Sequence, residues 1–594
     1  MSEHPPAGMS MAASGRGRWI GLAMLSVGVA MIIVDATIVN VAIPAIISDL
    51  SLDSTQAEWI NTIYALVFAA LLITVGRLGD VYGRRRMYLI GLSVFVTASV
   101  AAGLAPTGTV LLLARVFQGI GGAMILPATQ AILNANFQGR DRAIAFGIWG
   151  SVIGGMAAVG PLLGGFLTTY LSWRWAFFIN LPIGLVAIAG TLHYIGESRE
   201  EGARPGFDLP GFVLITSGLS LIVFGLIEGR QYGWWSPVPN HPFTILGWTW
   251  PSDAVSVIPA VLFLGAVALA LFALVETRRR RAGRFYLFDF TLWRYRGFRY
   301  GNLAGTIVSL GEFGLLFALP LFLQGVLGYS AFQTGLVFLS LAVGAFFSAP
   351  LAARFARRYG PRWVVTTGMI LEAVGILATS LLISTTVTGL MLMIPLFVYG
   401  IGVGFATAQL TSIVLSDVPV ERSGLASGAN STLRQVGSAL GIAILGTVLF
   451  SVLVNGSAAE FENIPPPPGV PPAVASQIGA FVSTALDASA GQVIGPLRDD
   501  PASVAALVDL PPEVEAFLRS PAAKEILAPY VVVAEQQFVD ATRAAGFVAT
   551  GFVILGVFFS LLLPATKPRG AEIAEVPARR SGGPIRPGVP TPPQ

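Results

Sequence analysis

The sequence predicts an all-α polytopic membrane protein, and three observations lead to this prediction. Of the 594 residues, 54% are hydrophobic and only 11% are Asp, Glu, Lys or Arg, whereas soluble proteins carry about 25% charged residues. Apolar segments follow one another almost without a break from Trp19 to Pro564. Many of them reach the length of about 20 residues that a helix needs to cross a hydrocarbon core about 30 Å thick. We therefore expect one membrane body rather than several soluble domains.

Fourteen apolar segments are predicted to be transmembrane helices. Because their number is even, both termini are expected on the same side of the membrane. The segments cover residues 19–43, 55–79, 85–105, 109–131, 143–169, 174–196, 209–229, 253–276, 298–326, 331–356, 362–384, 388–414, 424–454 and 541–564.

The placement of arginines predicts which side holds the termini. Basic loops tend to stay in the cytoplasm, and the loops near 44–54, 106–108, 327–330 and 385–387 contain no Lys or Arg. We therefore expect a multi-pass protein of the inner (cytoplasmic) membrane with both termini cytoplasmic. The net charge of +4 then reflects orientation, and no nucleic-acid partner is expected. The basic loops are the alternate ones, with arginines at 84–86, 140 and 142, 278–281 and 284, 354–362, and 422.

A weak internal repeat predicts the domain organisation. The segment GRLGDVYGRRR (76–86) returns in degraded form as ARFARRYGPRW (353–363), and FQGIGGA (117–123) is echoed by VYGIGVG (398–404). Repeated halves with a binding site at their interface are typical of secondary transporters. The predicted parts are a cytoplasmic tail (1–17), a six-helix bundle (18–200), two extra transmembrane helices (201–285), a second six-helix bundle (286–565) and a disordered cytoplasmic tail (566–594).

One long connection, residues 455–535, is predicted to lie outside the cell. It opens with a run of prolines and contains two segments that favour short surface helices, Pro472–Ala488 and Pro512–Ala528. Two interpretations stay open, namely a tolerated surface insertion and a lid over the outer entrance.

Several functions are disfavoured by residues that the chain lacks. There are no cysteines and only three histidines, so we expect no metal site. The only lysines, Lys524 and Lys567, do not lie in a phosphate-binding loop. We therefore expect no cofactor and no ATP drive, and we predict that the protein is not an enzyme. An intramembrane enzyme, or a binding role carried by the 455–535 connection, are the alternatives from other classes.

Two charged residues inside apolar segments are predicted to meet. Asp35 begins the motif DATIVNVAIP in the first segment, and Arg115 lies in LARVFQGIGGA in the fourth. A charge within the bilayer is costly and needs a partner. Counted along their helices, the two residues lie about 12 Å and about 9 Å from the same outer end. An arginine stabilises the charged form of a neighbouring aspartate, so separating and rejoining the pair would let the aspartate load and release a proton.

Two further motifs predict close contacts between helices. In GRLGDVYGRRR, glycines 76, 79 and 83 allow a tight turn, and Asp80 can pair with Arg84. In GGMAAVGPLLGGFL (154–167), small residues and a proline permit a bend and the close approach of another helix. These residues are Gly160, Pro161, Gly164 and Gly165.

These four motifs, in their order along the chain, resemble the major facilitator superfamily, and specifically its fourteen-helix drug–proton antiporters of the EmrB/QacA type. The resemblance covers nearly all of residues 18–565. It implies the major facilitator fold of two six-helix bundles plus two extra helices, with Asp35 in proton coupling and Arg115 in proton transfer. It also implies that Gly76, Asp80, Gly83 and Arg84 form a conformational latch, and that the 160–165 motif marks exporters.

The second half has its own candidates for coupling and substrate binding. Glu312 is expected to be a second protonatable or cation-recognising site, since burial makes a carboxyl easy to neutralise. Arg434 and Glu372 lie in apolar segments of the same half. Phe313 and Phe317 are candidates for stacking on an aromatic or cationic substrate, with lipid contact or core packing as the alternative. Gln118 and Trp149 complete the predicted substrate cavity.

The sequence thus predicts proton-driven efflux of drugs or amphipathic small molecules by alternating access, with the proton gradient as the energy source. A dedicated exporter of an endogenous lipid, siderophore or antibiotic is the alternative. The expected partners are an amphipathic or cationic substrate, protons and membrane lipid, and the protein is expected to be a monomer.

Overall fold

The computed structural model describes residues 15–137, 139–199, 206, 208–238, 242–245, 248–251, 255–419, 423–467, 470–506 and 512–564. In the first half, the helices are α1 (Gly15–Leu50), α2 (Ser54–Tyr82), α3 (Arg84–Gly103), α4 (Gly108–Asn136), α5 (Gly139–Tyr170), α6 (Trp175–Phe178) and α7 (Asn180–Tyr194). The middle of the chain forms α8 (Leu209–Tyr232), β1 (Thr244–Ile245), β2 (Trp248–Thr249), α9 (Val257–Arg281) and the 3-10 helix η1 (Phe290–Arg294).

The second half continues the helical pattern. Its long helices are α10 (Arg296–Gly325), α11 (Ala331–Tyr359), α12 (Pro361–Leu382), α13 (Gly389–Ser416), α14 (Ser423–Phe461) and α18 (Ala523–Ser560). Between α14 and α18 lie the shorter α15 (Pro472–Ala488), α16 (Ile494–Asp499), η3 (Pro501–Ala506) and α17 (Pro512–Leu518).

The long helices agree with a multi-pass membrane protein. Among the described residues, 12 helical segments are long and apolar enough to cross a membrane, with α6 and α7 counted as one segment. Two more helices, α2 with 29 residues and α5 with 32, lie on predicted segments but are not among the 12. The all-helical membrane architecture is therefore confirmed, while the count of fourteen crossings stays a prediction.

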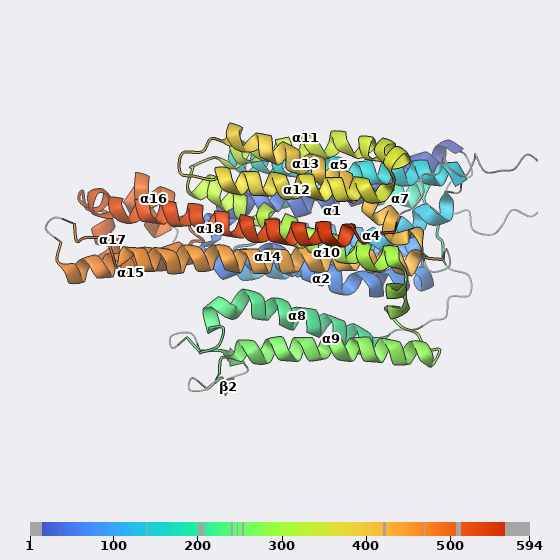
Figure 1. Cartoon of the computed structure of the whole chain (residues 1–594), viewed down its shortest axis with the longest axis horizontal. Helices are drawn as coiled ribbons and strands as arrows, with labels where there is room; N and C mark the ends of the chain where they lie inside the picture. Colours follow the sequence, from blue (N-terminus) through green and yellow to red (C-terminus); the bar gives the residue numbers. More distant parts are fainter. Residues whose placement is uncertain are drawn as a thin grey trace, which may run out of the picture.

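The long helices form two bundles (Figure 1). In the first, α1 packs on α5 and α7, and α4 packs on α2 and α3. In the second, α10 packs on α14 and α18, and α13 packs on α11 and α12. The bundles meet along two seams, α5 against α11 and α2 against α14. This arrangement is the one that the internal repeat predicts.

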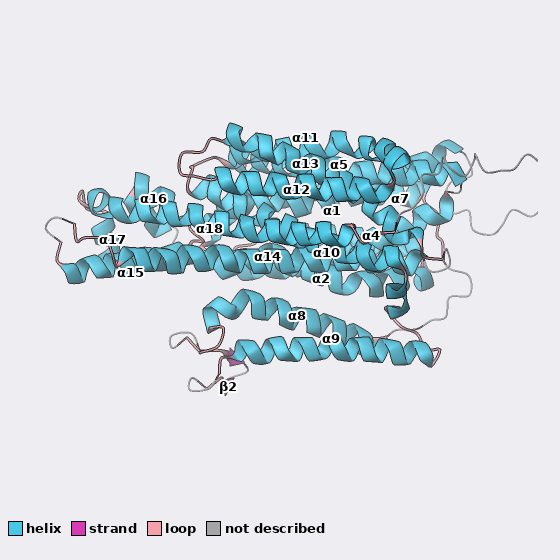
Figure 2. Cartoon of the chain, in the orientation of Figure 1, coloured by secondary structure: helices cyan, strands magenta, loops and turns pink. Residues whose placement is uncertain are grey.

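The extra helices α8 and α9 form a separate pair at the side of the bundles (Figure 1). They pack on each other, and α8 also contacts α2 and α14. The connection between them contains the strands β1 and β2, paired antiparallel (Figure 2). This short hairpin was not predicted, because two-residue strands leave no periodic pattern of apolar residues to detect.

The helices that flank the predicted connection 455–535 extend into it, and its described residues share the apolar core of the second bundle. Helix α14 continues to Phe461 and α18 already begins at Ala523, so both project beyond the bundles (Figure 1). The predicted surface helix Pro472–Ala488 is confirmed as α15, but the predicted Pro512–Ala528 divides into α17 and the start of α18. The helices extend beyond the predicted spans 424–454 and 541–564 because hydropathy marks only the apolar part of a helix, and these helices continue into a protein core.

That core joins the segment to the second bundle. Three residues of α15 are buried in the same apolar cluster as α10 and α14 of the second bundle, namely Ile478, Val482 and Leu486. The Tyr530 hydroxyl donates a hydrogen bond to the backbone oxygen of Ala475 at 2.9 Å. We call the end of the bundles that carries α15–α17 the outer end, following the predicted orientation.

Candidate functional site: a buried ion pair and an acidic cluster in opposite bundles

Asp35 of α1 and Arg115 of α4 form an ion pair inside the first bundle. The Arg115 Nη1 donates to Asp35 Oδ2 at 2.7 Å, and neither side chain is exposed. The contact predicted from helix depth is therefore present. An unpaired charge at such a site would be costly. Each residue therefore stabilises the charged form of the other.

Other side chains complete the hydrogen bonding of Asp35. Its Oδ1 accepts hydrogen bonds from Gln118 Nε2 at 2.9 Å and from Asn180 Nδ2 at 2.8 Å. Both amides also donate to the hydroxyl of Ser99. Gln118, predicted as a cavity residue, is fully buried and serves this network. Asn180 and Ser99 were missed, although Asn180 is a lone amide within the apolar run FFINLPIG.

Arg115 Nη1 also donates to Gln118 Oε1 at 3.0 Å, and helix α2 supplies further contacts. The Arg115 Nε donates to the backbone oxygen of Ile60 at 3.0 Å, and the guanidinium lies 4.3 Å from the ring centre of Tyr64. The pair is thus held by helices α1, α2, α3, α4 and α7 together. A change in the packing of any of these helices changes the stability of the charged aspartate.

The second bundle holds a different arrangement of acids. Glu312 on α10 is partly exposed, and Glu372 on α12 is 1% exposed. The two carboxyls repel each other electrostatically, and Arg434 on α14 attracts both. Tyr399 on α13 is fully buried within electrostatic range of both acids. The structure therefore brings Glu312, Glu372 and Arg434, separate in the sequence, into one cluster.

This cluster is not satisfied by internal hydrogen bonds. Glu372 Oε1 and the Tyr399 hydroxyl are buried without a partner among the described residues. Buried polar groups without partners are uncommon and costly. A ligand that donates hydrogen bonds or carries positive charge would therefore be stabilised here.

The predicted aromatic residues take different positions. Phe317 is fully buried, and its ring meets the ring of Phe450 edge-on at 6.2 Å. Phe313 is partly buried against the same apolar cluster. Trp149 packs on the smaller core of the first bundle. For Phe317 the structure therefore favours the alternative that the sequence left open, core packing.

The glycine motif of α5 allows α1 to approach closely. A methyl group added at Gly160 would collide with Thr37, and one added at Gly164 would collide with Ile38. Thr37 and Ile38 follow Asp35 by two and three positions, so the motif sets the packing of the helix that carries the ion pair.

The same motif also meets the second bundle. A methyl group at Gly165 would collide with the backbone of Ala331 at the start of α11, and one at Gly335 would meet the backbone oxygen of Pro161. The Phe332 backbone nitrogen donates to Thr169 Oγ1 at 2.9 Å across this seam. Helix α5 therefore couples the ion-pair helix to the other bundle.

The turn between α2 and α3 has the geometry that its glycines predict. Gly83 has a φ of 120°, a conformation that side chains disfavour. Glu197, after α7, accepts hydrogen bonds from the backbone nitrogens of Arg85 and Arg86 at 3.1 and 3.2 Å. A carboxylate at a helix N-terminus is stabilising, and Glu197 was not predicted. The expected pair of Asp80 with Arg84 lies outside the described side chains.

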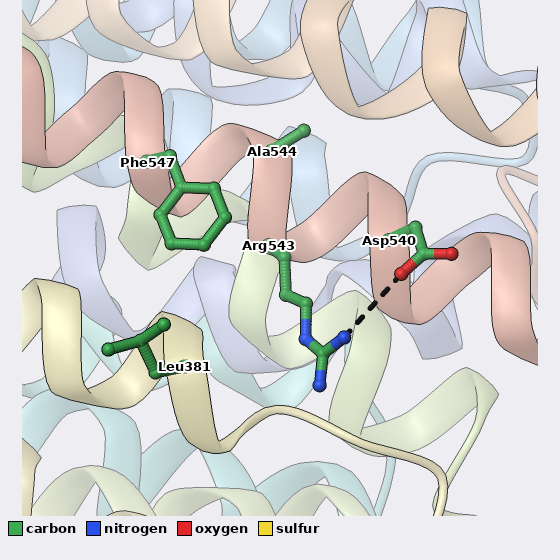
Figure 3. Close-up of a pocket in the computed structure, with 5 residues that line it drawn as sticks. All are labelled: Leu381, Asp540, Arg543, Ala544 and Phe547. Atoms are coloured by element: carbon green, nitrogen blue, oxygen red, sulfur yellow. Dashed lines mark ion pairs between the residues drawn. The ribbon is translucent and has the colours of Figure 1, made fainter.

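A surface groove lies apart from both sites, beside α12 and α18 (Figure 3). The Arg543 guanidinium pairs with Asp540 at 3.6 Å, and Phe547 flanks it (Figure 3). The groove contains none of the predicted substrate residues. Within the described part of the chain, no cluster of His, Cys, Asp or Glu is suited to a metal ion.

Two bundles of membrane-spanning length, joined along two seams and holding buried charges, define a multi-pass membrane transporter. Residues 25–442 match the family model described as Major Facilitator Superfamily, and the chain belongs to that family. The resemblance drawn from the four motifs is thereby confirmed.

Similar proteins agree with the drug-efflux branch. The chain is 35% identical to the puromycin resistance protein pur8 of Streptomyces alboniger, over 73% of this chain and 82% of that protein. It is 33% identical to the multidrug resistance protein Stp of Mycobacterium tuberculosis, over 76% of this chain and 80% of that one. A bacterial homologue of the human lysosomal transporter Spinster, in an inward-facing and unoccupied conformation, has the same fold. Its TM-score is 0.57 at 16% identity, covering 93% of this chain and 100% of that chain.

Proposed function

We propose that this protein exports drugs or other amphipathic small molecules across the cytoplasmic membrane in exchange for protons. The single observation that carries the proposal is the buried pair of Asp35 and Arg115, 2.7 Å apart and fully enclosed. A bilayer charge pair is a functional site by default. The names of two similar proteins, one for puromycin resistance and one for multidrug resistance, support drug efflux.

The proton step follows from the contacts of the pair. With Arg115 in place, Asp35 is stabilised as a carboxylate by the guanidinium and two amides. If α1 and α4 move apart, the charged form loses this support and the aspartate takes up a proton. Return of Arg115 favours the carboxylate again and releases the proton. The close packing of α5 on α1 would tie this exchange to the movement of the bundles.

The substrate step is proposed for the second bundle. Within the described part of the chain, Glu312 and Glu372 have no internal hydrogen bond, so a cationic or hydrogen-bonding drug would stabilise them. Alternating access then requires that substrate binding and protonation favour opposite arrangements of the two bundles. In this proposal both termini are cytoplasmic, the protein acts as a monomer without a cofactor, and it catalyses no covalent reaction.

A dedicated exporter of one antibiotic or other cellular product is the second candidate. One observation favours it: the relative named for puromycin is named for a single compound. The two candidates share the proton step and differ only in the range of cargo.

The first experiment measures efflux of ethidium from cells that express the chain. We expect wild-type cells to extrude the dye, a protonophore to stop the extrusion, and Asp35→Asn to abolish it. Glu515→Gln is the matched control, because Glu515 is an outer-end acid that pairs only with its helical neighbour Arg519 among the described residues.

The outcomes separate the candidates. If dyes of several unrelated structures are not extruded but resistance to one antibiotic rises, the dedicated exporter is supported. If efflux persists at the wild-type rate in Asp35→Asn at equal expression, the proposed coupling site is wrong.

A further inference from the structure

Another buried carboxylate lies at the outer end of the molecule, outside the sites described above. Glu58, in the first turns of α2, is 0% exposed. Both of its carboxyl oxygens are buried without a hydrogen bond among the described residues. The nearest cation is Arg230 of α8, whose Nη2 lies 3.9 Å from Glu58 Oε1. This separation is at the limit of an ion pair and is too long for a hydrogen bond.

Arg230 is engaged more closely by other groups. Its Nη1 donates to Asp487 Oδ1 of α15 at 2.7 Å, and its Nη2 donates to the hydroxyl of Ser54. The guanidinium also lies 5.2 Å from the ring centre of Phe450 on α14. The positive charge is therefore shared, and Asp487 rather than Glu58 is its main counter-ion.

Glu58 sits in the seam between the bundles. A methyl group added at Gly446 of α14 would lie 2.8 Å from the carboxyl carbon of Glu58. Next to it, Thr447 Oγ1 donates to the backbone oxygen of Leu226 on α8 at 2.8 Å. The carboxyl is thus enclosed by α2, α8 and α14, and separation of α2 from α14 would open it to water.

The charges that face Glu58 are mostly negative. They are Arg230 and Glu228 of α8, Asp487 of α15 and Asp53 in the turn before α2. Trp59 Nε1 donates to Glu228 at 3.0 Å. Burial raises the pKa of the Asp53 carboxyl, and the nearby Asp487 adds to this shift. A single shared arginine therefore faces several acids.

We propose that Glu58 is a second proton-binding site, which takes up a proton from the external side and holds the outer seam closed while protonated. A buried carboxylate without hydrogen bonds is strongly unfavourable, whereas the neutral acid can be enclosed between α2 and α14. When the seam opens, water reaches the carboxyl and the proton is released to it. Arg230 links the extra helices and α15 to this site, which gives the extra helices a part in gating.

The proposal rests on alternating access but not on drug export, so its test uses conformation rather than transport. Because the chain has no cysteine, single spin labels can be introduced at Leu104→Cys and Leu390→Cys. Leu104 follows the last residue of α3 and is 67% exposed, and Leu390 lies in the first turn of α13 and is 75% exposed. The two positions are in opposite bundles. Distances between the labels are measured in the purified full-length protein from pH 5 to pH 9.

In the wild type, we expect the open population of the outer end to rise with pH. Glu58→Gln, which mimics the protonated acid, should lower the ratio of open to closed protein at pH 9 by about fivefold or more. Arg230→Gln removes the cation that stabilises the carboxylate, so it should move the transition to higher pH. Glu515→Gln is the control and should follow the wild type.

A role in packing alone predicts a different result. It would leave the pH dependence of Glu58→Gln equal to that of the wild type, and that outcome would overturn the proposal. If Glu58→Gln does not fold, the Arg230→Gln variant is the test. An opening transition at the same pH as in the wild type, although the cation is gone, would also exclude a proton site at Glu58. If the wild type extrudes no dye but its outer end still opens with rising pH in a Glu58-dependent way, the proposal of drug export is contradicted and the proposal for Glu58 stands.

Discussion

In the first bundle, Asp35 accepts hydrogen bonds from Arg115, Gln118 and Asn180. In the second bundle, Glu312 and Glu372 have no hydrogen bond or ion pair among the described residues, and Arg434 acts on them only over a longer range. The two halves come from a repeated sequence, yet in the described part of the chain the central acid of the first bundle is paired internally and the acids of the second bundle are not. The satisfied carboxylate of Asp35 is held as a charge in one arrangement of helices, whereas unsatisfied acids leave hydrogen-bonding capacity for a ligand.

The comparison assigns different tasks to the two bundles. Breaking the satisfied network removes a charge balance that the fold needs. Neutralising one unsatisfied acid removes a group that no hydrogen bond or ion pair holds among the described residues.

Asp35→Asn should abolish proton-driven transport and lower stability by about 3–5 kcal/mol, because it leaves the Arg115 guanidinium buried without a counter-charge. The double variant Asp35→Asn with Arg115→Gln should recover most of the stability but none of the transport. Thermal denaturation of purified protein and substrate uptake in proteoliposomes under an imposed pH gradient measure the two effects. A single variant as stable as the wild type would contradict the account of a satisfied pair.

Gly165→Ala should reduce transport by about tenfold and cost about 1–3 kcal/mol, because the added methyl group meets the backbone of Ala331 in the seam between the bundles. Gly551→Ala is a matched control on α18, where an added methyl group meets nothing within 4 Å. Initial rates in the same proteoliposomes give the comparison. Equal rates for the two alanine variants would show that the seam tolerates the methyl group.

Glu372→Gln should leave stability within about 1 kcal/mol of the wild type, since no internal partner loses a bond. We expect KM to rise about tenfold for a cationic substrate, equivalent to about 1.4 kcal/mol, and to stay unchanged for a neutral one. Concentration-dependent uptake of the two substrates tests this split. A large loss of stability would mean that Glu372 is held by the fold, as Asp35 is.

The smallest effects are expected for two buried tyrosines whose hydroxyls have no partner among the described residues, Tyr64 and Tyr399. Replacement of either by Phe should change stability by less than about 0.5 kcal/mol. Tyr64→Leu, in contrast, removes the ring that faces Arg115 and should cost about 1–2 kcal/mol. Thermal denaturation distinguishes these variants, and a marked loss for Tyr399→Phe would reveal a hydrogen bond in the second bundle.

The sequence predicted the Asp35–Arg115 contact because two helices of known direction and depth leave few partners for a charge in the membrane. It did not predict Asn180 or Ser99, since an amide or a hydroxyl in an apolar segment is tolerated without a specific partner and gives a weak signal. It also did not reveal the arginine shared at the outer end, because Glu58, Arg230 and Asp487 lie in three distant segments.

By itself, then, the sequence determined the membrane architecture, the repeated bundles and the family, because hydropathy, arginine placement and local motifs act over one helix or one loop. Only the tertiary structure decided which acids are satisfied, since that depends on side chains that meet across several helices. It also decided where the outer segment begins, because helices α14 and α18 continue beyond their predicted apolar spans into a protein core. Hydrophobic periodicity cannot distinguish burial in lipid from burial in protein, and contacts between distant helices resolve that ambiguity.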